Sequence, residues 1–484
     1  LPSGRLTILW AKVSGPGTVR FSASDKATPL AQFSAAGTYV LSLRASDDAL
    51  SATDNVTVTV AAKSAPADPP TSPPTPPPEP SPPPEEPTNP GVRDTVELIG
   101  DPGFDMSSLP SSTRVWYERF LAALDNPSRD PDVTWAAAKG DLYQLGRYVG
   151  TDVTTTLTVF RLTGDLRLMD SVDEVMQVAR AQLKDTNGDG YPNWRWLFDP
   201  ADREWYGDDW HVMDELMTHG MVAEVAWAFQ QNRGLSSPKG VDYQERADFW
   251  ADYLKKWEAK WRKRNNKPTG FPFIYKNLTH PYLNLIRYLW YSYRLTGDQG
   301  YLNEATRLAN AFNQNELRSI STANGAGLVF PHGITKEEPT LDYLAPLHYA
   351  EYSTQVLMDL ALEPFGPFTV QGTLVPLANT IATRVIDNGS ADFAPSIGGS
   401  QAVGGLDMPS GEGRTPATRW AIYPLGEYAA YDRSGIIATV NEQVFSALER
   451  HAARPTRIAI PAAMVIKDLI DDPLPERVAQ SRGD

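Results

Sequence analysis

Cysteine is absent from this chain of 484 residues, so disulfides and thiolate metal sites are excluded. Long apolar runs are absent as well, because no stretch reaches the roughly 20 residues that a membrane-spanning helix needs. Positive charge is scarce, since 59 acidic residues outnumber 44 basic ones and give a formal net charge of −15. Nucleic-acid phosphates are bound by a basic field. We therefore expect neither nucleic acid nor a membrane as partner.

Proline and aromatic residues are plentiful by contrast, with 41 Pro, 13 Trp and 20 Tyr. Much of the proline lies in residues 63–91, which contain no hydrophobic residues able to form a core. Such a segment favours the extended polyproline II conformation and acts as a semi-rigid spacer. It separates residues 1–62 from residues 92–484, and a chain of this length calls for more than one domain.

Residues 1–62 alternate apolar and polar positions in the phrases RLTILWAKVS, TVRFSAS, TYVLSLRAS and NVTVTVA. This period of two, interrupted by Gly-rich or Asp-rich turns, predicts a small β-sandwich. The segment resembles the PKD-type, immunoglobulin-like modules of secreted bacterial polysaccharide-degrading enzymes. The first strand of such a module is missing from the pattern, so we expect further sequence before Leu1. Module, spacer and large domain together predict a secreted or cell-surface bacterial enzyme.

Residues 92–484 show helical periodicity and an internal repeat. The phrase RLTGD occurs at residues 161–165 and 294–298, each time between segments with apolar residues at helical spacing. Gly164 and Gly297 are expected to form left-handed turns, and the Asp after each to cap the next helix. Repeated helix pairs joined by alternating short and long loops predict a mainly α-helical (α/α) barrel or toroid. An α-solenoid for protein binding, with shorter and more regular repeats, is the alternative.

The long loops would wall a cleft, and the helices that follow them would begin there. These loops and helix starts hold five of the six histidines in the chain, with many Tyr, Trp, Asn and Arg. The candidate catalytic residues are His211, His280, Tyr282, Tyr343, His348, Tyr349 and Arg419. The candidate substrate-binding residues are Asn193, Trp194, Arg195, Trp205, Tyr206, Trp210, His219, Asn277 and Arg414.

His280 stands in the phrase NLTHPY, where a helix begins. Pro281 suits the first turn of a helix, and the usual capping residue is Ser, Thr, Asp or Asn. Because Thr279 is available as the cap, capping does not require His280, which favours a functional role. His219 and His348 lie within their helices, where a core histidine with satisfied hydrogen bonds is the alternative.

The phrase DTNGDGY places Asp185, Asn187 and Asp189 at alternate positions, with Gly190 at a sharp turn. This is how a calcium loop begins, although Trp196 stands where the bidentate Glu would be. A structural Ca²⁺ site and a plain Asx-rich turn are both consistent with the pattern. We expect no other cofactor.

Two reactions suit a carbohydrate cleft of this composition. A glycoside hydrolase, the inverting kind being the alternative here, needs two carboxylates roughly 5–10 Å apart. The candidates for such a pair are Asp208, Asp209, Asp214, Glu215, Asp342 and Glu351. A lyase acting on a uronate polymer needs a group that neutralises the C5 carboxylate, together with a Tyr or His base and acid. The residue types favour the lyase, and a non-catalytic carbohydrate-binding protein is a third alternative.

The repeat architecture and these residue types resemble the (α/α)-toroid polysaccharide lyases, which use an Asn–His–Tyr–Arg set on alginate, glucuronan or glycosaminoglycans. In the alginate lyases Asn directly precedes His, whereas Asn277 lies three residues before His280. The resemblance implies a monomer that cleaves an anionic polysaccharide, alginate or glucuronan, by β-elimination. His280 or His211 would neutralise the carboxylate or act as base, and Arg419 would contact the carboxylate. A tyrosine would be acid or base, and Trp194, Trp205 and Trp210 would support the sugars.

Overall fold

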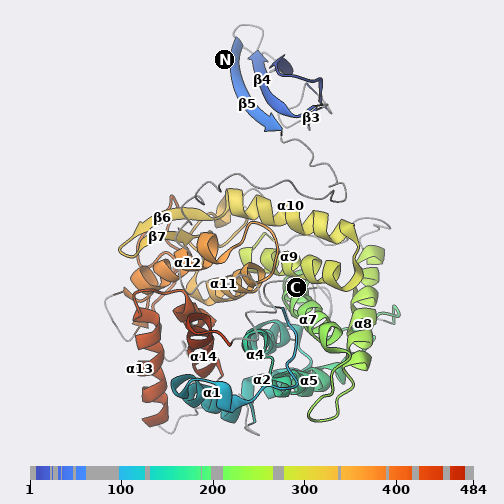
Figure 1. The fold of residues 1–484 in the computed structure, drawn as a ribbon, viewed down its shortest axis with the longest axis vertical. Coiled ribbons are helices and arrows are strands. Elements are labelled where there is room, and N and C mark those ends of the chain that lie inside the picture. The colour runs from blue at the N-terminus through green and yellow to red at the C-terminus, as the bar shows by residue number, and fades with distance from the viewer. Residues whose placement is uncertain are drawn as a thin grey trace, which may run out of the picture. The chain divides into compact units, whose positions relative to one another are not determined.

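The chain divides into two compact units, Leu1–Glu86 and Pro87–Asp484, in the computed structural model (Figure 1). The described residues are 7–21, 24, 31–33, 35–46, 51–60, 97–125, 131–186, 188–197, 211–264, 277–335, 339–387, 392–416, 424–450 and 458–474. The boundary between the units falls inside the proline-rich segment 63–91, which itself lies outside the described residues.

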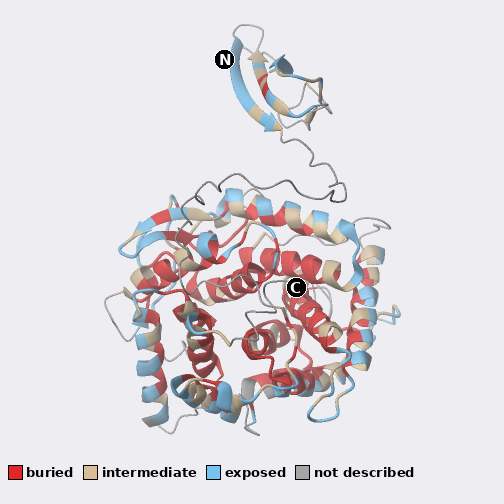
Figure 2. Cartoon of the chain, viewed as in Figure 1, coloured by how far each residue is buried: buried red, intermediate tan, exposed pale blue. Residues whose placement is uncertain are grey.

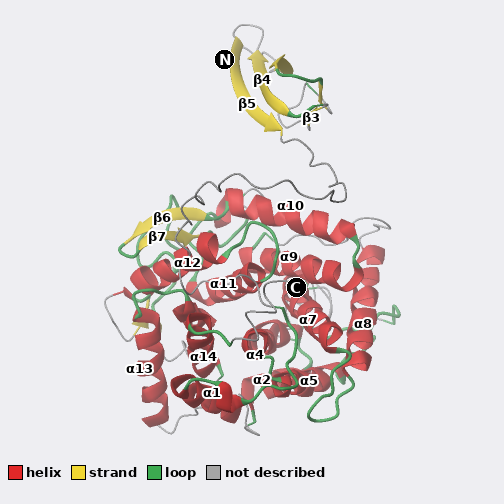
Figure 3. Ribbon diagram, in the orientation of Figure 1, coloured by secondary structure: helices red, strands yellow, loops and turns green. Residues whose placement is uncertain are grey.

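The first unit is built from antiparallel strands (Figure 3). A three-stranded sheet has the order β1-β4-β5, and β2 pairs with β3. The strands are β1 (Thr7–Ser14), β2 (Val19–Phe21), β3 (Ala31–Phe33), β4 (Gly37–Ser46) and β5 (Ser51–Val60). The alternating sequence pattern predicted all of them except the short β3. The central strand buries Tyr39 and Leu41, whereas every side chain of β5 is exposed or half-buried.

The second unit is mainly helical, as predicted. Its helices are α1 (Ser111–Leu124), α2 (Pro131–Lys139), α3 (Leu142–Gln144), α4 (Gly150–Thr163), α5 (Leu166–Arg180), α7 (Val212–Asn232), α8 (Tyr243–Arg264), α9 (Thr279–Thr296), α10 (Gln299–Asn315), α11 (Leu347–Leu362), α12 (Val375–Thr380), α13 (Ile436–Arg450) and α14 (Ala459–Asp471). A π-helical turn, Leu145–Val149, joins α3 to α4. None of the helices in the described part of the chain is long and apolar enough to cross a membrane.

The most buried helices contact one another in chain order around a centre (Figure 2). Helix α4 contacts α7, α7 contacts α9, and α9 contacts α11. A 3₁₀ helix, Pro424–Ala430, then links α11 to α14, and α14 returns to α4. Helices α5, α8 and α10 pack outside α4, α7 and α9 as the second members of helical hairpins. Each hairpin thus pairs a buried helix with a more exposed one.

The two RLTGD phrases form the turns that the sequence predicts. Gly164 and Gly297 end α4 and α9 in the left-handed conformation, with φ of 73° and 70°. Asp165 accepts a hydrogen bond from the Arg167 N–H at 3.0 Å, and Asp298 accepts one from the Gly300 N–H at 2.8 Å. Both aspartates therefore cap the following helix, as expected.

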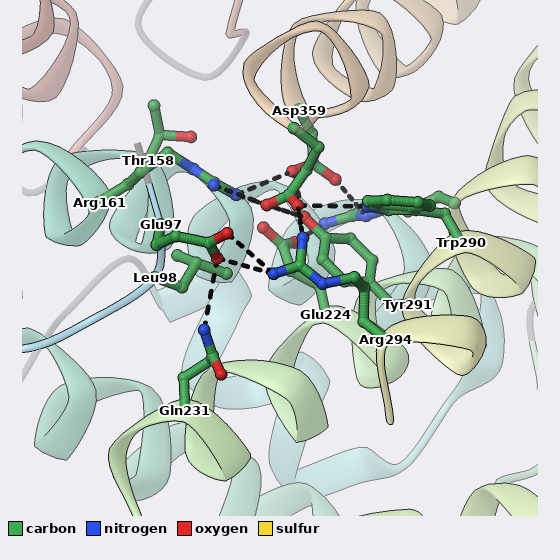
Figure 4. A network of polar contacts seen from close by, with 12 residues as sticks. Glu97, Leu98, Thr158, Arg161, Glu224, Gln231, Trp290, Tyr291, Arg294 and Asp359 are labelled. Carbon is green, nitrogen blue, oxygen red and sulfur yellow. Dashed lines mark hydrogen bonds and ion pairs between the residues drawn. The ribbon is translucent and has the colours of Figure 1, made fainter. Parts of the chain in front are cut away.

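The arginines of the two phrases meet on one carboxylate, which the sequence did not predict. Arg161 Nη1 lies 2.6 Å from Glu363 Oε1, and Arg294 Nη1 lies 2.8 Å from Glu363 Oε2. Glu363 directly follows α11, so the C-terminal ends of α4, α9 and α11 are tied together. Arg294 also donates to both carboxylate oxygens of Glu97, at 2.8 and 3.0 Å (Figure 4). We call Arg161, Arg294, Glu363 and Glu97 the C-terminal hub.

Two segments expected to be plain loops contain short strands. Within residues 315–341, β6 (Arg318–Thr322) and β7 (Gly325–Val329) form an antiparallel hairpin. Farther on, β8 (Asp392–Phe393) pairs with β9 (Thr415–Pro416).

Candidate functional site

Three loop segments are joined by backbone hydrogen bonds beside the start of α9. The Thr279 N–H donates to the His332 carbonyl at 3.0 Å, and the His332 N–H donates to the Tyr343 carbonyl at 2.8 Å. The Ile334 N–H donates to the Asn277 carbonyl at 2.6 Å. A Cβ on Gly333 would lie 2.4 Å from the Leu341 Cβ, so this position requires glycine. The loops thus carry His332 and Tyr343 to the start of the helix that bears His280.

Histidine and tyrosine rings gather at this place. The Tyr349 ring centroid lies 5.1 Å from that of His280, 4.8 Å from that of His332 and 4.2 Å from that of His348. The Tyr343 ring stacks on His332 with centroids 5.4 Å apart. We call these five residues the His–Tyr cluster. Four of them are candidate catalytic residues from the sequence. The structure adds His332, which lies in the loop after β7.

A buried arginine lies near His280, close enough to affect the pKa of its ring. Arg147, in the π-helical turn before α4, is paired with Asp214 of α7. The second oxygen of Asp214 lies 2.7 Å from Trp196 Nε1 and 2.8 Å from His211 Nδ1. The His211 and Trp196 rings stack with centroids 4.5 Å apart. We call Arg147, Asp214, His211 and Trp196 the arginine clamp.

The clamp and the cluster adjoin one another through Tyr352. Arg147 Cζ lies 5.8 Å from the centre of the Tyr352 ring, whose centroid is 6.3 Å from that of His280. Burial would raise the pKa of Asp214, but Arg147 and His211 outweigh it and hold that pKa well below its ordinary value. Burial, with the nearby Arg147 cation, holds the pKa of His280 well below its ordinary value. The site therefore contains an ionised Arg–Asp pair beside a neutral imidazole.

Several polar atoms of the site are buried without a partner. His280 is 0% exposed, and neither of its ring nitrogens makes a hydrogen bond within the described residues. His332 Nδ1 is likewise without a partner there. Buried polar groups are almost always hydrogen-bonded in folded proteins. Unsatisfied imidazoles at this position are what a site awaiting a polar ligand would show.

Thr279 does not cap α9, contrary to expectation. Its hydroxyl donates to the Pro331 carbonyl at 2.7 Å, and the capping position is Leu278, without a side-chain cap. The hydroxyl instead holds the loop that carries His332. His280 is not a cap either, because both ring nitrogens lack partners in the described part of the chain.

Tyr282 lies away from the cluster. Its hydroxyl donates to the Leu308 carbonyl at 3.4 Å, and its ring packs against Phe312 at 6.1 Å. Both partners belong to α10, so the side chain faces the outer helix. The structure gives Tyr282 a packing role between α9 and α10, and we do not place it in the site.

A second polar group at the start of α7 holds several predicted substrate-binding residues in the core. Glu215 accepts from Asn193 Nδ2 at 2.6 Å and from the buried Lys260 Nζ at 2.8 Å. His219 is bonded through both ring nitrogens, to the Glu215 carbonyl at 2.7 Å and to the Tyr253 hydroxyl at 2.8 Å. Trp194 is 1% exposed and donates to the Ala179 carbonyl. A buried indole cannot serve as a sugar platform, so Asn193, Trp194 and His219 hold the scaffold.

The remaining predicted residues lie at the edges of the site or outside the described residues. Arg414 pairs with Asp387 on the surface and donates to the Asp392 carbonyl at 2.6 Å. Arg195 and Asn277 are half-buried, and their backbone groups bond to Gly140 and Ile334. The predictions for Trp205, Tyr206, Trp210, Arg419 and Asn187 fall on residues that the structure does not describe.

In the segment considered as a calcium loop, the side chain of Asp185 bonds to the backbone of the same loop. Asp185 accepts from the N–H groups of Asp189 and Gly190 at 3.1 and 2.9 Å. Asp189 pairs with Arg264 at 2.8 Å. No group of three or more His, Asp or Glu side chains suited to a metal occurs among the described residues. These contacts are those of an Asx-rich turn, and the Ca²⁺ alternative stays a prediction because Asn187 lies outside the described residues.

Arg147 escaped sequence reasoning, because an isolated polar residue inside a helical run gives no signal. Tyr352 and His332 lie on segments expected to face the cleft but were not among the candidate site residues. Asp214 was considered only as a hydrolase carboxylate, although its partners Arg147, Trp196 and His211 are all donors. The π-helical turn that presents Arg147 is a feature often found at functional sites, but it is visible only in the structure.

Comparison with protein-family models, with curated proteins and with solved structures finds no match. The resemblances to toroid lyases and to PKD-type modules therefore stay predictions.

Proposed function

We propose that this chain is a secreted polysaccharide lyase that cleaves a uronate-containing polymer, alginate or glucuronan, by β-elimination. The observation that carries the proposal is the His–Tyr cluster, in which the Tyr349 ring lies among three histidines. The closed sequence of contacts through α4, α7, α9, α11 and α14 supports an (α/α) toroid as its scaffold.

The cluster has the groups that elimination needs. A base removes the C5 proton, the C4–O4 bond breaks with formation of a C4–C5 double bond, and an acid protonates the departing O4. Tyr349 is half-buried, and its hydroxyl makes no hydrogen bond within the described residues. We assign Tyr349 the role of the acid that protonates the departing O4. Burial and the nearby His348 lower the pKa of His332 to about 4, so His332, like His280, is a neutral imidazole able to accept a proton.

Three of the six candidate carboxylates are engaged by cations or other donors, which supports elimination over hydrolysis. Asp214 is held by Arg147, Trp196 and His211. The other carboxylate at the start of α7, Glu215, is held by Lys260, Trp257 and Asn193. Neither is placed as a free general acid or base. Asp342 is exposed and paired with Arg318 at 2.9 Å.

The deciding experiment incubates the full chain with alginate, glucuronan, chondroitin and a neutral glycan. It follows the ultraviolet absorbance of the unsaturated uronate that only elimination creates. New reducing ends without this absorbance would identify a hydrolase. Binding without either signal would identify a carbohydrate-binding protein.

Variants assign the roles. Tyr349→Phe should lower the elimination rate by at least about 100-fold, as expected for loss of a general acid. His280→Asn and His332→Asn identify the base, which should be the one with the larger loss in kcat. Tyr282→Phe removes a hydroxyl from the same type of side chain on the far side of α9, and should keep the activity. Equal activity of Tyr349→Phe and the unmodified chain would remove Tyr349 from the mechanism.

A further inference from the structure

Arg147 is a buried cation, and three of its five N–H groups have no hydrogen-bond partner among the described residues. The side chain is 5% exposed. Its Nη1 contacts Asp214 Oδ1 and lies 3.2 Å from the Tyr143 carbonyl. Nε and Nη2 make no hydrogen bond to any described residue. These two atoms form one edge of the planar guanidinium, the edge that binds a carboxylate with two parallel bonds.

The unused edge is held rigidly. Arg147 Cζ lies 3.8 Å from the centre of the Tyr143 ring, which supports one face of the guanidinium. Asp214 is 0% exposed and is itself fixed by Trp196 and His211. A Cβ on Gly146 would lie 2.9 Å from the Met217 Cβ, so only glycine lets the turn approach α7 this closely. An arginine fixed in this way does not have to be ordered when a ligand binds.

The surroundings favour an anion. Helices α7, α9 and α11 begin at the site with Asp214, His280 and His348 in their first turns. The amino ends of helices carry partial positive charge and attract anions. His280 and His332 add buried ring nitrogens that lack partners in the described structure. A negatively charged group that accepts hydrogen bonds, as a carboxylate does, suits these surroundings.

We propose that Arg147 binds the carboxylate of a sugar acid through Nε and Nη2, while Nη1 remains on Asp214. Asp214, Trp196 and His211 are positioning residues that keep this edge aimed at the ligand. The inference rests on the proposed function in taking a uronate as the substrate. It assigns the carboxylate to Arg147 in place of Arg419, the residue expected from the sequence.

The test measures binding rather than turnover. Titration calorimetry on the full chain compares a uronate oligosaccharide with the same oligosaccharide after reduction of its carboxyl groups to alcohols. The unmodified chain should prefer the uronate. Arg147→Gln and Arg147→Lys should lose most of this preference, by roughly 10- to 100-fold, because a charged two-bond contact is lost. Arg307→Gln removes an exposed guanidinium paired with Glu304, and should keep the preference.

The conservative variant separates binding from folding. Arg147→Gln leaves Asp214 buried without its cation, which can unfold the chain, whereas Arg147→Lys retains a cation for Asp214. Thermal unfolding identifies the folded variants. A purely structural role would lower the amount of active protein without changing the preference for the uronate, and would overturn the inference.

The outcomes distinguish this inference from the proposed function. Arg147-dependent preference for the uronate without elimination would support the carboxylate site and contradict the lyase. Elimination with an unchanged KM and an unchanged preference in Arg147→Lys would support the lyase and contradict the site. An unmodified chain with no preference for the uronate would contradict the site directly.

Discussion

His219 and His280 show why burial alone does not mark a functional residue. Both are 0% exposed, and burial holds the pKa of both well below the ordinary value. His219 has a partner on each ring nitrogen, whereas His280 has none in the described structure. A satisfied imidazole holds the scaffold, and an unsatisfied one is available to a ligand. The sequence places His280 at a helix start and His219 two turns into its helix, but it cannot show which ring is satisfied, because the ring partners can come from distant segments.

Protonation of His332 should make the fold sensitive to acid. A histidine whose pKa is lowered to about 4 in the folded state contributes stability above its ordinary value of 6.5. That stability is lost as the pH falls from about 6.5 towards about 4, because the unfolded chain binds the proton more readily. Between about pH 7 and pH 4.5 the loss is on the order of 2 kcal/mol, at about 1.4 kcal/mol per unit of pKa.

Urea unfolding of the unmodified chain and of His332→Asn measures this contribution. The variant lacks the titrating group, so its free energy of unfolding should fall by about 2 kcal/mol less over this pH interval. The difference between the two curves isolates His332 from every other group that titrates in the same range. Parallel curves would contradict the assignment.

At the scale of elements, two consecutive residues of α7 have different roles: Asp214 belongs to the arginine clamp, whereas Glu215 holds the scaffold. Asp214 points to Arg147 and His211, and the next residue, Glu215, points to Lys260 of α8. Helical geometry turns consecutive side chains by about 100°, so neighbours in sequence serve different partners. The helix must therefore be fixed both along its axis and in rotation for the site to form.

Close packing of α7 on α9 supplies that fixation. A Cβ on Gly220 would lie 2.9 Å from the Asn284 carbonyl oxygen of α9. Gly220→Ala should push the helices apart, destabilise the fold by about 1–3 kcal/mol, and lower elimination, because the helices carry His211 and His280. Gly234→Ala is the matched control, since a Cβ there has nothing within 4 Å. Equal melting temperatures and activities of the two variants would contradict this account.

The sequence predicts elements whose causes are local. The RLTGD turns follow from a glycine that accepts positive φ and an aspartate that caps, and both are present. The β6–β7 hairpin was not predicted, since residues 315–341 were expected to form one of the long loops. The joining of residues 277–280 to residues 330–334 is a long-range event, and no local pattern encodes it.

At the scale of the helical unit, the two ends of the buried helices have different chemistry. Their starts hold the His–Tyr cluster and the arginine clamp, which contain unsatisfied groups within the described structure. Their ends hold the C-terminal hub, where Arg161 and Arg294 share Glu363. Incomplete bonding at the starts of the helices must be offset by stability elsewhere. We expect the hub to contribute to it.

The segment that enters the helical unit is part of this stabilisation. Leu98 is 0% exposed, and its carbonyl accepts from Asn232 Nδ2 at 2.8 Å. The Gly100 N–H donates to Asn232 Oδ1 at 2.6 Å, and Glu97 completes the pairing of Arg294. Residues 97–100 thus bind the ends of α7 and α9, although they precede every helix of the described structure in sequence.

Two truncations test this role. Removal of residues 1–90 takes away the β unit and most of the spacer, and should leave the melting temperature of the helical unit and its activity unchanged. Removal of residues 1–101 also takes away Glu97, Leu98 and Gly100. It should destabilise the unit by about 3 kcal/mol, because it exposes the site of a buried leucine and leaves buried polar groups unpaired.

A matched point variant keeps the chain length constant. Leu98→Ala in the full chain removes only the apolar part of the contact, and should cost about 2–3 kcal/mol. Because the hub lies at the helix ends opposite the site, both changes should lower stability before they alter KM. Equal melting temperatures of the two truncations would show that residues 97–101 do not stabilise the helical unit. A change in KM at unchanged stability would show that the two ends are coupled.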